Sequence, residues 1–213
     1  MTLFWGNLLC LLFCLPFFVC LFFFLQIGDW LSGLGLFLSL GLLGPGLTGL
    51  NFICMRLIRD KHVSLGTDFF ASVKRDWKQS AAFGWILGLL WGTLAWAVRL
   101  VSLTQGGLGI GLSAVLLVSA FVMMGLTVIG FQQIAMVCLP FRGVLRNGLV
   151  LILAGGGRAA AAIGFALAAT AVCLNFYQYC VWYLVLGAPA LMILTANLIF
   201  YPVFETFFPE EES

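Results

Sequence analysis

Residues 2–56 read TLFWGNLLCLLFCLPFFVCLFFFLQIGDWLSGLGLFLSLGLLGPGLTGLNFICMR, and Asp29 is the only formally charged side chain in this stretch before Arg56. The whole chain of 213 residues is 63% hydrophobic and 8% charged, with a mean hydropathy of +1.14. Soluble domains carry about 25% charged residues. Because a soluble core of this size cannot hide so much apolar surface, the sequence predicts an all-α polytopic membrane protein.

Long apolar runs recur along the chain, and most reach the roughly 20 residues that an α-helix needs to cross a bilayer. The simplest count is about six transmembrane helices in a single membrane domain, 1–213, with spans at about 3–26, 31–58, 81–103, 108–139, 148–176 and 181–204. The first run lacks the basic segment and the cleavage pattern of a secretory signal, so we expect it to be a retained helix. Pro16 and Pro45 predict bends in the first two spans.

The Lys and Arg residues are distributed unevenly among the loops. Six of the ten lie between Arg56 and Lys78, and Arg142 and Arg146 lie in the next loop on the same side. The loop around Asp29 contains none. Since short loops rich in Lys and Arg stay in the cytoplasm, the sequence predicts a multi-pass protein with both termini cytoplasmic and Asp29 outside.

The first basic loop contains an amphipathic pattern that predicts a cytoplasmic helix at about 67–79. The apolar residues at helical spacing and the basic residues between them are, in chain order, Phe69, Phe70, Val73, Lys74, Arg75, Trp77 and Lys78. Such a helix would lie in the cytoplasmic interface, with its apolar side toward the acyl chains and its basic side toward anionic headgroups. The alternative is a docking site for a cytoplasmic partner.

The second basic segment contains Arg142 and Arg146 and leads to a glycine triplet, 155–157, followed by Arg158. Three consecutive glycines weaken a helix by about 1 kcal/mol each relative to alanine, which indicates a hinge. If 141–154 is a short interfacial helix, Arg158 lies at the cytoplasmic surface and the fifth span runs from about 159 to 176. If the span starts at Asn147, Arg158 lies in mid-membrane, where a charge costs at least about 2.5–3.5 kcal/mol.

Motifs for catalysis, metal binding or nucleotide binding are not evident in the sequence. His62 is the only histidine, which excludes a site with several histidines. The glycine triplet at 155–157 is not followed by the Lys-Ser or Lys-Thr of a phosphate-binding loop. We therefore expect no enzymatic activity, no cofactor, no bound metal and no nucleic acid partner.

Polar side chains near the spans are few, and any substrate path would have to use residues such as Asn51, Gln132 and Asn197. No Asp or Glu lies in the middle of a predicted span, which argues against proton- or ion-coupled transport. Gly84, Gly88 and Gly92 recur at four-residue spacing and predict close helix packing, with a homo-oligomer interface as the alternative.

Several segments in the first 90 residues resemble the YesL family, a group of small bacterial membrane proteins that share a domain of unknown function. The segments that carry the resemblance are Asn7–Pro16, Gly44–Leu50, Arg56–Asp60, Asp68-Phe69-Phe70, Lys74 and Trp77–Ser80. The later segment Leu145–Ala154, followed by Arg158, resembles the family more loosely.

This resemblance implies a protein of the bacterial cytoplasmic membrane with an accessory role in carbohydrate uptake by ABC-type importers. The expected partners are the lipid bilayer and ABC transporter subunits. The alternative function is a self-contained transporter or channel for small molecules, acting alone or as a homo-oligomer. The accessory function predicts that Phe69, Phe70, Lys74, Arg75 and Trp77 touch another protein. Contacts with a partner or with the membrane surface are predicted at Phe69, Phe70, Lys74, Arg75, Trp77, Lys78, Arg142, Arg146 and Arg158.

Overall fold

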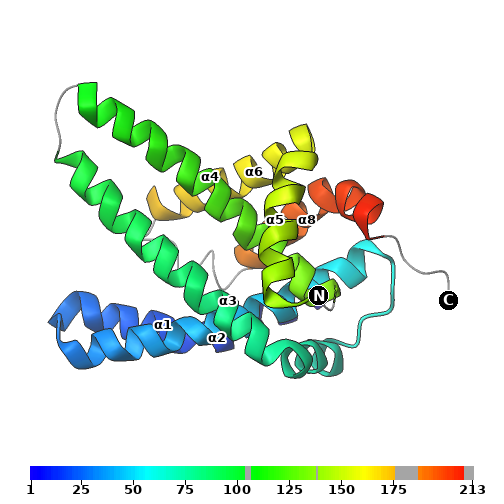
Figure 1. Ribbon diagram of the computed structural model, residues 1–213. Helices are drawn as coiled ribbons and strands as arrows, with labels where there is room; N and C mark the ends of the chain where they lie inside the picture. Colours follow the sequence, from blue (N-terminus) through cyan, green and yellow to red (C-terminus); the bar gives the residue numbers. More distant parts are fainter. Residues whose placement is uncertain (104–106, 138, 176–186, 209–213) are drawn as a thin grey trace.

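The computed structural model describes residues 1–103, 107–137, 139–175 and 187–208, and these ranges contain seven helices and no strand (Figure 1). The helices are α1 (Thr2–Ile27), α2 (Trp30–Ile58), α3 (Leu65–Ser102), α4 (Gly107–Met136), α5 (Phe141–Ala154), α6 (Gly156–Asn175) and α8 (Ala188–Phe207). All except α5 are long and apolar enough to cross a membrane. The all-α polytopic fold with six spans is thus confirmed; residues 181–186 of the last predicted span lie outside the described ranges.

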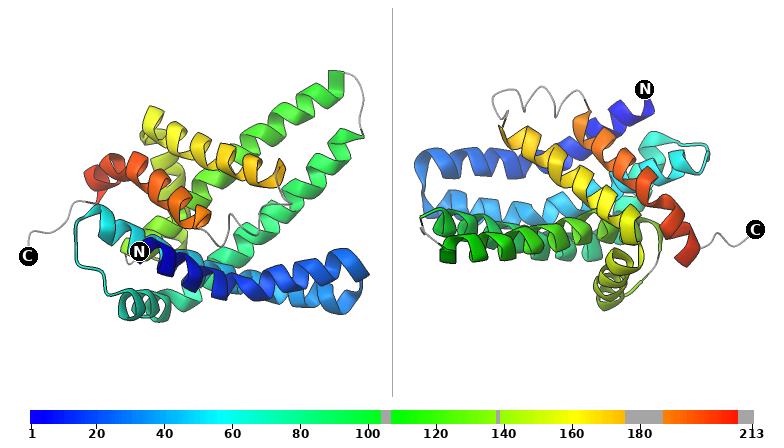
Figure 2. Two further views of the ribbon diagram at one scale, coloured as in Figure 1. Left: turned by 180° about the vertical axis from the view of Figure 1, so that it is seen from behind. Right: turned by 90° about the horizontal axis from the view of Figure 1, so that it is seen from above.

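Nine of the ten Lys and Arg residues belong to one end of the helix bundle, which we call the basic end. This end contains the start of α1, the connection between α2 and α3, the first turns of α3, the end of α4, all of α5, the first turns of α6 and the end of α8 (Figures 1 and 2). Arg99, near the last turn of α3, is the exception. The two basic segments that the sequence places on the same side of the membrane therefore lie at the same end of the bundle.

Helix α2 is the central element of the fold and contacts α1, α3, α4 and α8. More than half of its apolar window is buried, against less than a quarter for α1, α3, α4 and α6. The largest core lies between α2, α3, α4, α5, α6 and α8 and includes Phe83, Ile129 and Phe200. A smaller core of Cys10, Cys14, Leu50, Cys54 and Ala190 joins α1, α2 and α8. Pro16 and Pro45 lie inside α1 and α2, so neither proline ends its helix.

Helices α2 and α3 cross with their backbones in close contact. A Cβ atom on Gly44 would lie 1.8 Å from the carbonyl oxygen of Ser80, and one on Gly84 would lie 2.9 Å from the amide nitrogen of Gly44. One on Gly88 would lie 2.6 Å from the Leu40 side chain. The predicted packing role is therefore confirmed for Gly84 and Gly88, but it is wrong for Gly92, where an added Cβ would meet no atom within 4 Å.

The sequence predicts separate helices at 67–79 and 81–103, but the structure joins them in the single helix α3. Its 38 residues correspond to about 57 Å at 1.5 Å per residue, nearly twice a hydrocarbon core of about 30 Å. The first turns of α3 point in a different direction from the rest (Figure 1). Near this bend the Ser80 hydroxyl donates to the carbonyls of Asp76 and Trp77, at 2.8 and 3.2 Å, a pattern that often bends helices.

The predicted span 148–176 is wrong, because the chain turns between α5 and α6 within it. Gly156 adopts a left-handed conformation with φ of 50°, which glycine tolerates without steric cost. Helix α5 runs across the bundle instead of along it (Figure 1), and its 14 residues are too few to cross a bilayer. The structure thus has the short helix of the first alternative, with Arg158 exposed in the first turns of α6.

We expect Gly44→Ala or Gly84→Ala to lower the free energy of unfolding by about 1–3 kcal/mol, as overpacked sites do, because the new methyl group meets backbone atoms. Thermal or denaturant unfolding in detergent micelles would measure the effect. Gly92→Ala is the matched control on α3 and should leave stability equal or slightly higher. Equal losses of unfolding free energy for Gly84→Ala and Gly92→Ala would contradict the close backbone contact between α2 and α3 at Gly84.

Candidate functional site

The first turns of α3 are fixed by one buried side. Phe69 is fully buried and Val73 is 5% exposed, and both pack against Ile53 of α2. The Phe69 ring occupies the space where Gly49 lacks a side chain, since a Cβ there would lie 2.6 Å from the ring. The prediction that Phe69 contacts the membrane or a partner is therefore wrong, because α2 already covers it.

The other side of the same turns faces outward. Phe70 is 49% exposed and Trp77 is 39% exposed, and both rings lie 6.4 Å from the ring of Phe13 on α1. Lys74 and Lys78 are exposed between them. We call Phe70, Lys74, Trp77 and Lys78 the outward face of α3.

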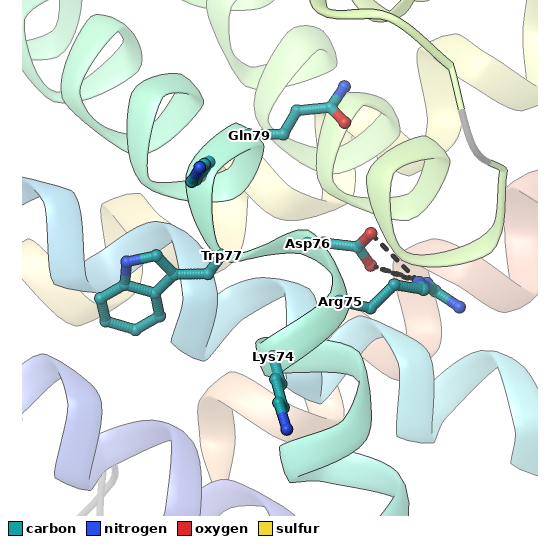
Figure 3. Close-up of a pocket in the computed structure, with 6 residues that line it drawn as sticks. Lys74, Arg75, Asp76, Trp77 and Gln79 are labelled. Carbon is teal, nitrogen blue, oxygen red and sulfur yellow. Dashed lines mark hydrogen bonds and ion pairs between the residues drawn. The ribbon is translucent and has the colours of Figure 1, made fainter.

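An open hollow of about 570 Å³ lies at the bend of α3, beside the six consecutive residues from Lys74 to Gln79. Figure 3 shows Trp77 and the ion pair between Arg75 and Asp76 on different sides of the helix. At this point of α3 the outward face therefore lies on a different side of the helix from the residues that contact α4.

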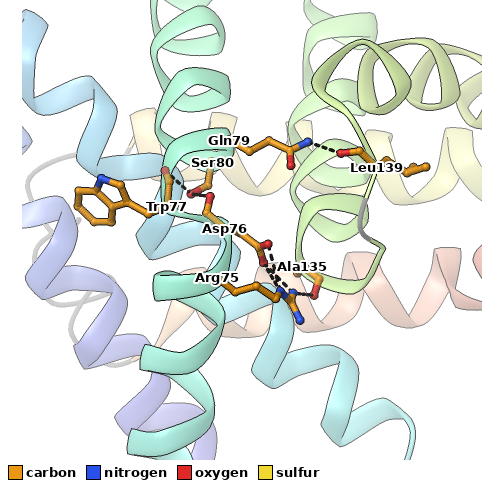
Figure 4. Close-up of polar contacts among 7 residues, drawn as sticks. All are labelled: Arg75, Asp76, Trp77, Gln79, Ser80, Ala135 and Leu139. Atoms are coloured by element: carbon orange, nitrogen blue, oxygen red, sulfur yellow. Dashed lines mark hydrogen bonds and ion pairs between the residues drawn. The ribbon is translucent and has the colours of Figure 1, made fainter.

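Arg75 and Gln79 connect α3 to the end of α4 (Figure 4). An Arg75 Nη atom donates to the carbonyl of Ala135 at 2.6 Å and to the Asp76 carboxylate at 2.7 Å. The Gln79 amide donates to the carbonyl of Leu139 at 2.8 Å. Because carbonyls in the last turn of a helix lack partners within the helix, and a cation there is favoured by the helix dipole, Arg75 is a structural residue. Its side chain is nevertheless 44% exposed, so its predicted role as a surface contact stays a prediction.

A second ion pair holds the start of α3. Arg56 at the end of α2 contacts Asp68 at 2.9 Å and also donates to the carbonyl of His62 at 2.7 Å. Asp68 accepts in turn from the backbone N–H of Ser64, the residue that precedes the helix. The Arg56 and Arg75 guanidinium groups both lie within 6 Å of the centre of the Phe52 ring, which places both cations against α2.

Helix α5 contributes a further exposed stripe at the basic end. Arg142, Arg146, Leu149 and Leu153 are exposed and follow each other at intervals of four, three and four residues, so they share one helix face. Val144, Gly148 and Leu151 on the opposite face are buried. No ion pair or side-chain hydrogen bond of Lys74, Lys78, Arg142, Arg146 or Arg158 is formed with the described part of the chain. These five cations are therefore available to anionic groups outside the protein.

The three residues predicted for a polar path lie in the core. Asn197 donates to Asn51 at 3.0 Å, and Gln132 donates to the sulfur of Met55 at 3.1 Å, one helical turn from Asn51. All three are at most 4% exposed. The amide oxygens of Gln132 and Asn197 and both polar atoms of the Gln133 side chain have no hydrogen-bond partner among the described residues. The structure thus brings the three residues together between α2, α4 and α8, but not along an open channel.

Sequence reasoning missed the residues that fix the outward face from neighbouring elements. Gly49 receives Phe69, Phe13 lies against Phe70 and Trp77, and Gln79 binds the segment after α4. Nothing in the spacing of these residues indicates a contact, because each partner lies on a different element.

Comparisons of the chain with protein-family models, with curated proteins and with solved structures gave no match.

We expect Arg75→Gln to lower the free energy of unfolding by about 1.5–3 kcal/mol, the usual value of hydrogen bonds to a charged group. The change also leaves the Asp76 carboxylate, only 11% exposed, without its cation. Lys74→Gln is the matched control and should change stability by less than about 0.5 kcal/mol. If Arg75→Gln and Lys74→Gln have the same free energy of unfolding in detergent, the hydrogen bond from Arg75 to α4 does not contribute to stability.

A double-mutant cycle would measure the link between α2 and α8. Asn51→Ala and Asn197→Ala should each destabilise the protein, because each leaves a buried amide without its partner. The double variant should lose less than the sum, by about 0.6–1.7 kcal/mol, the range found for hydrogen bonds between membrane helices. Strict additivity in unfolding experiments would show that the two amides do not interact.

Proposed function

We propose that this protein is a non-enzymatic accessory subunit of a membrane complex and that it docks through the outward face of α3. One observation carries this proposal: the start of α3 is fixed to its neighbours on one side and exposed on the other. Buried Phe69 and the hydrogen bonds of Arg56 and Arg75 hold the helix in place. The residues that remain exposed are Phe70, Lys74, Trp77 and Lys78. Side chains that are already ordered lose little entropy on binding. Exposed aromatic residues also dominate the energetics of many protein interfaces.

Helix α5 supports the same end of the molecule at the membrane surface. Its exposed stripe has arginines in the first half and leucines in the second half. This arrangement suits a helix whose axis is inclined to the membrane surface, with the arginines of its first half near anionic headgroups and the leucines of its second half toward the acyl chains. We propose that the basic end faces the cytoplasm, in accordance with the distribution of Lys and Arg, and that both termini are cytoplasmic.

The class of partner follows from the resemblance to the YesL family. We propose that the protein acts in the cytoplasmic membrane of a bacterium, beside the permease or ATPase subunits of a carbohydrate ABC importer. The partner surface should be acidic with exposed apolar side chains, because it would meet two lysines and two aromatic rings.

A self-contained transporter or channel is the second candidate, and the buried amide groups favour it. The amide oxygens of Gln132 and Asn197 lie in the core without a donor among the described residues, and such atoms are costly in an apolar interior. A conformation that opens between α2 and α8 would offer them to a polar substrate. In that case Asn197→Ala would change flux in vesicles while the outward face would not matter.

Affinity purification from native membranes tests the accessory function. We expect the tagged protein to recover ABC transporter subunits in mild detergent, detected by mass spectrometry. Phe70→Ala with Trp77→Ala should reduce this recovery at least about tenfold, which corresponds to about 1.4 kcal/mol of binding energy.

The matched control is Phe23→Ala with Trp30→Ala, which removes one exposed phenylalanine and one exposed tryptophan near the other end. This control should leave recovery unchanged, and both double variants should insert into the membrane in equal amounts. Recovery of transporter subunits by both double variants alike, or of no subunit at all by the parent protein, would contradict the proposal.

A further inference from the structure

A groove of about 670 Å³ opens between α1, α2 and α3 in the half of the bundle away from the basic end. Its size lies within the roughly 300–1,000 Å³ of pockets that bind small ligands. Among the described residues of its lining only Thr93 has a hydroxyl, and that hydroxyl donates to the Leu90 carbonyl at 2.8 Å. The indole N–H of Trp91 is also bonded, to Thr127 at 3.2 Å. The indole N–H of Trp96, an exposed residue of the lining, has no partner among the described residues. The rest of the lining is apolar, which suits a hydrocarbon chain.

Gly92 is the position at which the groove is open. It is exposed, and a Cβ atom there would meet nothing within 4 Å. Gly88, one turn earlier, is instead closed by Leu40. A side chain at residue 92 would therefore project into the groove without displacing any part of the fold.

Arg99 lies on the same face of α3 as the groove. It follows Trp96 by three residues and Gly92 by seven, and residues at these intervals share a helix face. The rise of 1.5 Å per residue places Arg99 about 10 Å beyond Gly92. Trp96, between them, is 64% exposed, as expected for a tryptophan near the headgroup level. Arg99 is exposed and forms no ion pair within the described ranges.

We propose that this groove binds an acyl chain of an anionic phospholipid and that Arg99 holds the phosphate of the same lipid. Guanidinium groups bind phosphate oxygens through two parallel hydrogen bonds. Charge complementarity favours this occupant over a second copy of the chain. The acidic residue near the same end of the bundle, Asp29, already caps α2 by accepting from the backbone N–H of Ser32 at 3.2 Å.

The test uses the full chain in phosphatidylcholine vesicles with a small fraction of a phospholipid that carries a photoactivatable acyl chain. The labelled lipid is phosphatidylglycerol in one arm and phosphatidylcholine in the other. After irradiation, mass spectrometry of peptides locates the cross-links. We expect them on residues 33–43 and 88–96, with labelling by phosphatidylglycerol about tenfold stronger, as one charge-assisted contact allows.

Two variants test the binding of the acyl chain and the binding of the headgroup separately. Gly92→Leu should reduce labelling of the groove by either lipid about tenfold, because the leucine fills it. Arg99→Gln should keep labelling by phosphatidylcholine and remove the preference for phosphatidylglycerol. Gly164→Leu is the matched control, since Gly164 is an exposed glycine of α6 with no atom within 4 Å of an added Cβ, and it should leave labelling unchanged.

Three results would overturn the proposal. Undiminished groove labelling in Gly92→Leu would mean that the acyl chain lies elsewhere. Equal labelling by both lipids in the parent protein would contradict the selection of an anionic headgroup at Arg99, since phosphatidylcholine carries a phosphate but no net charge. Conversion of a dimer to a monomer by Gly92→Leu, seen by native mass spectrometry, would assign the groove to a second copy of the chain. Equal thermal stability of the parent and Gly92→Leu would show that the fold is retained in each case.

Discussion

The backbone contact between α2 and α3 at Gly44 and Gly84 is the constraint on which the rest of the structure depends. Lipid tails are as apolar as leucine, so helices in a bilayer associate through close packing and hydrogen bonds instead of a hydrophobic driving force. This crossing fixes α3 against the most buried helix of the fold. Since α3 is continuous, the crossing also positions its outward face at one end and the groove at the other.

The basic residues of this protein serve two different purposes. Arg56 and Arg75 use their guanidinium groups for ion pairs, backbone carbonyls and the ring of Phe52. Lys74 and Lys78 lie near Arg75 in the sequence and are exposed without an ion pair among the described residues. The structural arginines hold the helix still, and the exposed lysines give it a charged surface. A fixed helix with a basic and aromatic surface is suited to docking or to anchoring at a membrane, and the proposed function uses it for docking.

The sequence was sufficient for features that depend on local composition, and insufficient for those that depend on contacts between helices. The number of spans and the basic end follow from hydropathy and charge alone, whereas hydropathy did not show the turn between α5 and α6 inside the predicted span 148–176. Phe69 and Phe70 fit the same helical pattern, and only Gly49 on another helix decides that Phe69 is buried. Arg75 binds backbone carbonyls, which every residue carries. Gly84 and Gly92 look alike in sequence, yet one lies against backbone and the other lines an open groove.

Reporter fusions that reveal the compartment of each connection test the central claim, which is that six helices span the membrane while the start of α3 and all of α5 stay on one side. We predict the same cytoplasmic signal for fusions after Asp60, Arg142 and Arg158, and the opposite signal for fusions after Asp29 and Leu103. Opposite signals after Arg142 and Arg158 would show that α5 crosses the membrane. An external signal after Asp60 would invert the orientation and place the outward face of α3 outside the cell.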